Sequence, residues 1–127
     1  MIYKFEKLRV WNKASELIDE VYLITDELPE KEKFNLSSQT NRAATSVALN
    51  IAEGSTSQSD NEQLRFIGYA VRSLIEVIAC LILISKRDYP DVDHKQLDKA
   101  RKKADSLFIS LQAFKRALNK TSEPESE

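Results

Sequence analysis

The sequence predicts an all-α protein, an up-and-down antiparallel four-helix bundle. Apolar residues recur at steps of three and four along four separate segments, the spacing typical of amphipathic helices. The 127 residues include only two glycines and three prolines, too few for the many tight turns of a sheet-rich fold. Short connections between the segments favour antiparallel neighbours over a coiled-coil rod.

The first segment, residues 6–28, has one apolar face and one charged face, and it ends before Pro29, because a residue before proline disfavours helical geometry. Residues 30–35, "EKEKFN", are expected to form an irregular or short helical turn. The apolar stripe consists of Leu8, Trp11, Ala14, Leu17, Ile18, Val21, Ile24 and Leu28, and the outer face carries Lys13, Glu16, Asp19, Glu20 and Asp26.

The second segment, residues 37–54, is rich in small side chains. Ser37 is its predicted N-cap, preceded by the apolar Leu36. Gly54 is a suitable C-terminal stop. Small residues such as Ala43 and Ala44 predict that another helix approaches this one closely.

The third segment, residues 59–87, begins at "SDNE", where Ser59 can cap the helix and Glu62 can reach back to complete a capping box. Its most apolar run, "VIACLILI", is closed by Glu76 and Lys86. That run is much shorter than the roughly 20 residues that a membrane-spanning helix needs. We therefore expect a buried helix and no membrane association.

The fourth segment, residues 93–119, follows a loop broken by Pro90, and Asp93 with Gln96 repeats the capping pattern. The polar, acidic residues 121–127 predict a disordered tail. One bundle domain is therefore expected over residues 1–120.

A polar strip runs beside the small residues of the second segment. Leaving a buried polar group unpaired costs about 1 to 3 kcal/mol, so we predict partners for this strip on the third segment. An alternative is a ligand-binding or catalytic pocket between the second and third segments, with carboxylates as acid and base. The predicted network consists of Arg42, Ser46, Asn50, Glu53, Ser73 and Glu76.

Metal and cofactor chemistry are not expected. A helical di-metal site would need Glu-x-x-His pairs, and His94 is the one histidine. Cys80 has apolar neighbours, which should raise its pKa rather than produce a reactive thiolate. Because this cysteine is alone and the N-terminal residues lack a signal-peptide pattern, we expect a reducing, cytoplasmic location.

The apolar arc of the third segment is broader than one bundle should need, since a surface helix buries only about a third to half of its circumference. The surplus indicates that another chain covers it, although a very central helix of a single chain is the alternative. The predicted oligomer interface consists of Leu64, Ile75 and Ile82.

The fourth segment carries a surplus of cations within a chain of net charge -1. Repeated in an oligomer, these cations could contact phosphates weakly and with strong salt dependence. A solvated lysine face that only aids solubility is the alternative. The predicted nucleic-acid contacts are Lys95, Lys99, Lys102, Lys103, Arg116 and Lys120.

Three stretches, "LRVWNKASELI", "LSSQTNRAATSVALNIAEG" and "FIGYAVRSLIEV", resemble the four-helix-bundle proteins encoded in intervening sequences of bacterial 23S ribosomal RNA genes. The chain is also similar to the accessory protein of diversity-generating retroelements. Arg72 departs from the pattern, which has a small residue there. Either close packing is lost at this point, or a replacement contact to Glu76 or Glu53 is expected.

The resemblance implies a bundle that assembles into a ring, a homopentamer, with no catalytic activity. Neither relative implies a cofactor. The combined expectation is a non-enzymatic, self-associating bundle that associates with RNA or acts as a scaffold.

Overall fold

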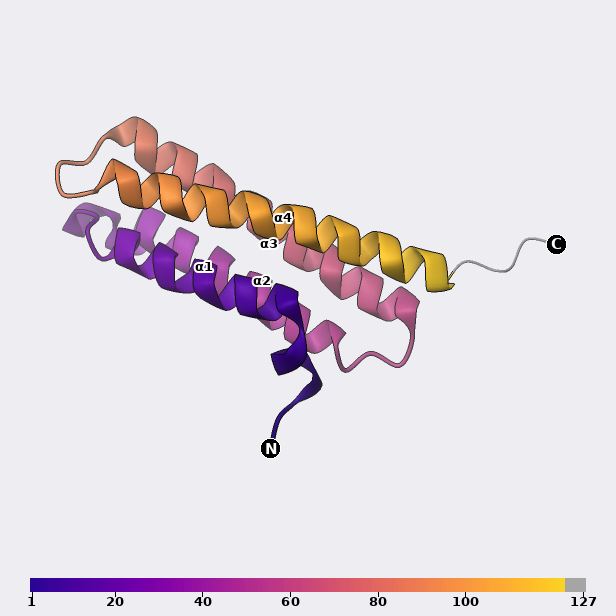
Figure 1. Ribbon diagram of the computed structural model, residues 1–127. Coiled ribbons are helices and arrows are strands. Elements are labelled where there is room, and N and C mark those ends of the chain that lie inside the picture. The colour runs from indigo at the N-terminus through magenta and orange to yellow at the C-terminus, as the bar shows by residue number, and fades with distance from the viewer. Residues whose placement is uncertain (123–127) are drawn as a thin grey trace.

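The computed structural model describes residues 1–122 and contains four long antiparallel helices (Figure 1). Each helix packs against its neighbour in the chain, and the first closes the bundle against the last. Both the first and the third helical connections lie at the same end (Figure 1). The predicted up-and-down bundle is confirmed. The helices are α1 (Arg9–Thr25), α2 (Ser38–Gly54), α3 (Asp60–Arg87) and α4 (His94–Ser122).

The segments around α1 are more regular than the sequence pattern indicates. A 3₁₀ helix, Lys4–Lys7, precedes α1. After Thr25 the backbone tightens, because Leu28 N–H donates to the Thr25 carbonyl. A second 3₁₀ turn, Glu30–Glu32, then leads into a π-helical turn, Lys33–Ser37. The predicted end at residue 28 is therefore three residues too late.

The helix caps differ in how far they follow the prediction. Ser37 makes no capping hydrogen bond and has helical backbone angles, because the π-helical turn continues directly into α2. The predicted cap at Ser37 is wrong. Ser59 does cap α3, accepting from the Glu62 N–H at 3.1 Å. The return bond of a capping box is absent from the described hydrogen bonds at this cap.

The connection from α3 to α4 uses left-handed backbone geometry at Asp88, with φ at 52°. Asp93 Oδ1 then accepts from the Lys95 N–H at 2.9 Å and caps α4 as predicted, but the Gln96 side chain binds Glu20 rather than completing a capping box. Helix α4 continues to Ser122, two residues into the predicted tail. Residues 123–127 of that tail lie outside the described residues.

The core runs along the length of the bundle and draws on all four helices. Fully burying one large aliphatic side chain, such as a leucine or an isoleucine, stabilises the fold by about 1.5 to 3 kcal/mol. Helix α2 contributes small buried side chains, among them Ala43, Ala44 and Ala48. A Cβ at Gly54 would lie 3.1 Å from Phe66 Cβ of α3. The largest fully buried residues include Leu17, Ile24, Ile51, Ile67, Leu74, Ile84, Leu107 and Leu111.

Candidate interaction surfaces

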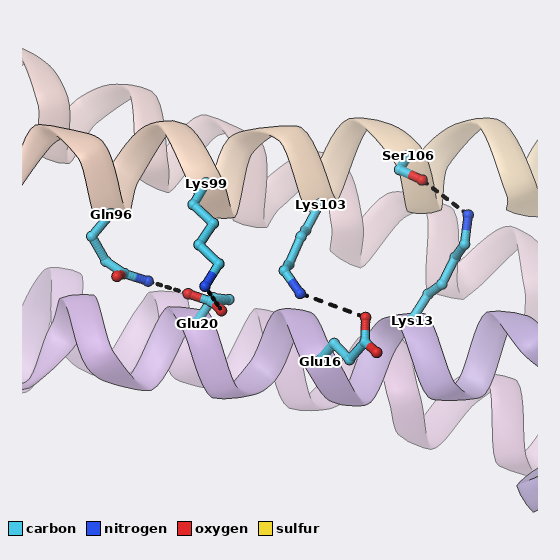
Figure 2. A network of polar contacts seen from close by, with 7 residues as sticks. All are labelled: Lys13, Glu16, Glu20, Gln96, Lys99, Lys103 and Ser106. Carbon is cyan, nitrogen blue, oxygen red and sulfur yellow. Dashed lines mark hydrogen bonds and ion pairs between the residues drawn. The ribbon is translucent and has the colours of Figure 1, made fainter.

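Polar contacts join α1 to α4 along one side of the bundle (Figure 2). Lys13 Nζ donates to Ser106 Oγ at 2.9 Å and to Ser110 Oγ at 2.8 Å. Further along, Glu16 pairs with Lys103, with 3.5 Å between Oε2 and Nζ. As the residue number rises along α1, the residue number of the partner on α4 falls. These contacts therefore follow one antiparallel register.

Glu20 is the buried member of this set. Its carboxylate accepts a hydrogen bond from the Gln96 amide and pairs with Lys99 Nζ at 3.2 Å (Figure 2). The residue is 7% exposed, so its predicted place on the outer face is wrong. It lies on the side of α1 that α4 covers. A buried carboxylate needs partners of this kind because losing its hydration is costly.

The α1–α4 contacts divide the cations that we expected to bind nucleic acid. Lys99 and Lys103 point toward α1 and are paired with carboxylates (Figure 2). Lys99 nonetheless stays exposed and Lys103 is half-buried, so the nucleic-acid contact expected of both stays a prediction. The other four remain exposed and form no ion pair within the described part of the chain, and they are Lys95, Lys102, Arg116 and Lys120.

An exposed apolar stripe runs along α3. Ile75 is 50% exposed and Ile82 is 38% exposed, while Leu64 is half-buried. The stripe continues at alternating steps of four and three, the repeat of helix pairs that pack knobs into holes. We call this set the α3 stripe, and it consists of Leu64, Gly68, Val71, Ile75, Ile78 and Ile82.

The predicted polar network is brought together only in part. Ser46 and Ser73 share a hydrogen bond of 2.9 Å between α2 and α3. The Asn50 amide donates to the Ser46 carbonyl at 2.9 Å and to its hydroxyl at 3.1 Å. These three half-buried residues therefore form one interhelical cluster.

The charged members of that network stay outside the cluster. Arg42, Glu53 and Glu76 are exposed, and no hydrogen bond of their side chains appears within the described residues. Arg72 is exposed as well and pairs with neither Glu76 nor Glu53, so the expected replacement contact does not form within one chain. Long charged side chains on outward-facing positions keep their hydration instead.

A hollow of about 440 Å³ lies over the outer side of α2. Its lining includes Tyr22 of α1 and residues of α2, but no residue of α3. It therefore lies between α1 and α2, and not between the second and third helices where we expected a pocket. Its lining is Tyr22, Asn41, Arg42, Thr45, Ser46, Leu49, Asn50 and Glu53.

A buried contact at the loop end of the bundle was missed by sequence reasoning. The Tyr89 hydroxyl donates to the Glu32 carboxylate, which also accepts from the Asn35 amide at 2.9 Å. The Tyr89 bond, followed by that of Asn35, lowers the pKa of Glu32. The same bond to Glu32, together with burial, raises the pKa of Tyr89. We call the contact of Glu32, Asn35 and Tyr89 the clasp. It joins the α1–α2 connection to the α3–α4 connection, which are far apart in sequence.

Cysteine and histidine take ordinary roles. Burial raises the pKa of Cys80, as predicted. The His94 ring lies 2.7 Å from Asp88 Oδ1 near the start of α4. Among the described residues, no group of three His, Cys, Asp or Glu side chains could hold a metal ion.

Over the part of the chain that the structure describes, α3 is long and apolar enough to cross a membrane, judged by length and composition alone. The run "VIACLILI", on which we based the expectation of no membrane association, is shorter than the apolar window found within the whole helix. A central helix of a soluble bundle has the same property, and α3 packs against both α2 and α4.

The fold defines a small helical-bundle protein with exposed apolar side chains on α3 and exposed cations on α4. A sequence model of the 23S rRNA-intervening sequence protein family matches residues 6–113. The chain therefore belongs to this family, whose function is unknown. Among curated proteins no significant match is found.

Proposed function

We propose that the protein is a non-enzymatic helical bundle that self-associates into a ring-like homo-oligomer, a homopentamer as its family resemblance implies, and acts as a scaffold or RNA-associated protein. The exposed α3 stripe carries this proposal. Ile75 and Ile82 are isoleucines at the surface of a helix whose opposite face, with Leu74, Val77 and Leu81, is buried in the core. Fully burying an isoleucine is worth about 1.5 to 3 kcal/mol, so covering the exposed parts of both favours association by about 2 kcal/mol in each contact.

Light scattering after size-exclusion chromatography tests the self-association. We expect the wild type to elute as an oligomer and Ile75→Glu with Ile82→Glu to elute as a folded single chain. Leu83→Glu is the matched control, because Leu83 is also 50% exposed but points about 100° away from Ile82 around the helix. A wild type that remains a single chain at high concentration would refute the proposal.

The RNA-associated half of the proposal rests on the four exposed cations of α4 that have no carboxylate partner among residues 1–122. Each subunit of a ring would add the same set, and phosphate contacts accumulate with their number. Sequence discrimination should be poor because these cations are not interleaved with aromatic residues that could stack on bases.

Fluorescence anisotropy with structured RNA across a salt series tests this half. We expect weak binding that falls steeply with salt, and Lys102→Ala should weaken it. Lys99→Ala is the matched control, because Lys99 is already paired with Glu20 and should change affinity less. Binding that is undetectable at low salt would remove RNA from the proposal and leave the scaffold.

A further inference from the structure

Gly68 lies well inside α3, where a glycine weakens the helix relative to alanine. A Cβ added there would meet nothing within 4 Å. Gly54, by contrast, is needed because Phe66 approaches it closely. Nothing inside the chain therefore uses the missing side chain of Gly68. Because Gly68 belongs to the α3 stripe, its bare backbone is suited to close approach by something outside the chain.

Two cations bracket this bare position. Arg65 stands three residues before Gly68 and Arg72 four residues after it, and both are exposed. Residues at these spacings lie on the same side of a helix, one turn to either side. Neither arginine forms an ion pair within the described residues. The surface of α3 thus has a position without a side chain, which we call the depression, between two positive charges that have no ion-pair partner among the described residues.

A projection of matching pattern lies on α1. Tyr22 is 44% exposed, with Asp19 three residues before it and Asp26 four residues after it, both exposed. Neither aspartate is in an ion pair within the part of the chain that the structure describes. Asp26 follows the last residue of α1 but keeps helical backbone angles. The two aspartates and the two arginines therefore have the same separation of seven residues, which is roughly 10 Å along a helix.

These two features cannot meet within one chain. Helix α3 packs against α2 and α4, and α1 packs against the same two helices. The bundle therefore places α1 and α3 diagonally opposite, as Figure 1 shows. The projection on one copy can reach the depression only on another copy.

We propose that Tyr22 of one copy packs over Gly68 of the next, with Asp19 and Asp26 paired to Arg65 and Arg72. This contact rests on the proposed self-association and names its second surface. The two surfaces differ, so the contact is head-to-tail, which closes into a ring or grows as a filament. A two-fold contact of the α3 stripe centred on Gly68 would instead bring Arg65 of one copy against Arg72 of the other, and these like charges repel.

The tyrosine and the glycine play complementary parts in this contact. An aromatic ring offers a large apolar area with little loss of conformational freedom, and a glycine backbone accepts it without displacing a side chain. The exposed Leu49 lines the same hollow as Tyr22. It can extend the contact along the α3 stripe.

Cross-linking between two single-cysteine proteins tests the contact directly. Both proteins carry Cys80→Ala, and one adds Tyr22→Cys while the other adds Gly68→Cys. On mild oxidation, a disulfide-linked dimer should form in the mixture and not with either protein alone, because a disulfide needs Cα atoms about 4.4 to 6.8 Å apart. Leu23→Cys replaces Tyr22→Cys in the control, since Leu23 is also exposed but points elsewhere, and it should cross-link far less.

Charge reversal gives a second readout that does not depend on cysteine. Arg65→Asp with Arg72→Asp should weaken association by about tenfold or more, since like charges then face each other. Asp19→Arg with Asp26→Arg should do the same. The chain with all four reversals should recover association. Arg116→Asp, on α4, is the control and should leave association unchanged.

The outcomes separate this contact from the proposed function. An oligomeric wild type that Ile75→Glu disrupts, without cross-linking of Tyr22→Cys to Gly68→Cys and without charge rescue, would overturn the contact and leave self-association standing. Efficient cross-linking of Gly68→Cys to itself would show a two-fold contact and also overturn the proposal. A wild type that is always a single chain would refute both.

Discussion

Replacing Glu20 by alanine should destabilise the bundle more than replacing any other acid of the α1–α4 contacts. Its carboxylate is buried and accepts from Gln96 and Lys99. Alanine leaves the half-buried Gln96 amide without its acceptor. Losing a buried hydrogen bond to a charged group costs about 1.5 to 3 kcal/mol, so we expect a loss of about 2 kcal/mol in the free energy of unfolding.

Two companion variants separate burial from charge. Glu20→Gln keeps the shape and one acceptor oxygen, and the lost attraction to the exposed Lys99 is worth at most about 1 kcal/mol. Glu16→Ala removes a pair whose carboxylate is 65% exposed, so its cost should be below about 0.5 kcal/mol. The predicted order of destabilisation is therefore Glu20→Ala, then Glu20→Gln, then Glu16→Ala.

Urea unfolding followed by circular dichroism measures these differences. All variants must be compared at one protein concentration, because self-association adds to apparent stability. Lysine partners at Lys99 and Lys103 stay in place throughout. Equal losses for Glu20→Ala and Glu16→Ala would refute the reasoning, because only Glu20 is buried and holds the Gln96 amide.

Three further predictions concern the core and the loop end. The lowered pKa of Glu32 means that the clasp contributes stability above the pKa of an unfolded glutamate, about 4.3, and loses it as the pH falls through the lower folded value. The free energy of unfolding of Tyr89→Phe should thus differ most from that of the wild type near pH 7 and least near pH 3. Urea unfolding at each pH measures this difference, and a difference that does not change with pH would contradict the prediction. Gly54→Ala should lower stability despite better helix propensity, because its Cβ would press on Phe66; a stabilised variant in thermal unfolding would contradict close packing. Cys80 should react with a thiol reagent slowly in the native protein and rapidly in urea, since burial raises its pKa, and equal rates would show that it is accessible.

Local patterns were sufficient for much of the fold. The three-to-four spacing identified all four helices, and Ser59 was found as a cap because capping depends on residues within one turn. Ser37 has a side chain suited to capping, but it does not cap α2 because the turn before it is already helical. The exposed Ile75 and Ile82 were also anticipated, since a helix cannot turn an apolar arc that broad entirely inward.

The charged residues show where local reasoning stops. Glu20 reads as an outer residue on its own helix, and Lys99 reads as a free cation on its own helix. Only the packing of α1 against α4 places them together. The Glu32 and Tyr89 clasp has the same character, because two loops meet only when the bundle closes.

The amino-acid sequence by itself determined that this chain forms four amphipathic helices, which of their faces are apolar, and that α3 has an apolar surplus. Those properties depend on side chains within a few residues of one another. The tertiary structure alone decided which charges are paired and that no other part of the chain packs against the position of a Gly68 side chain. It also decided that Tyr22 on α1 lies diagonally opposite Gly68 on α3. Such facts depend on the rotation and register of whole helices, which long-range packing sets.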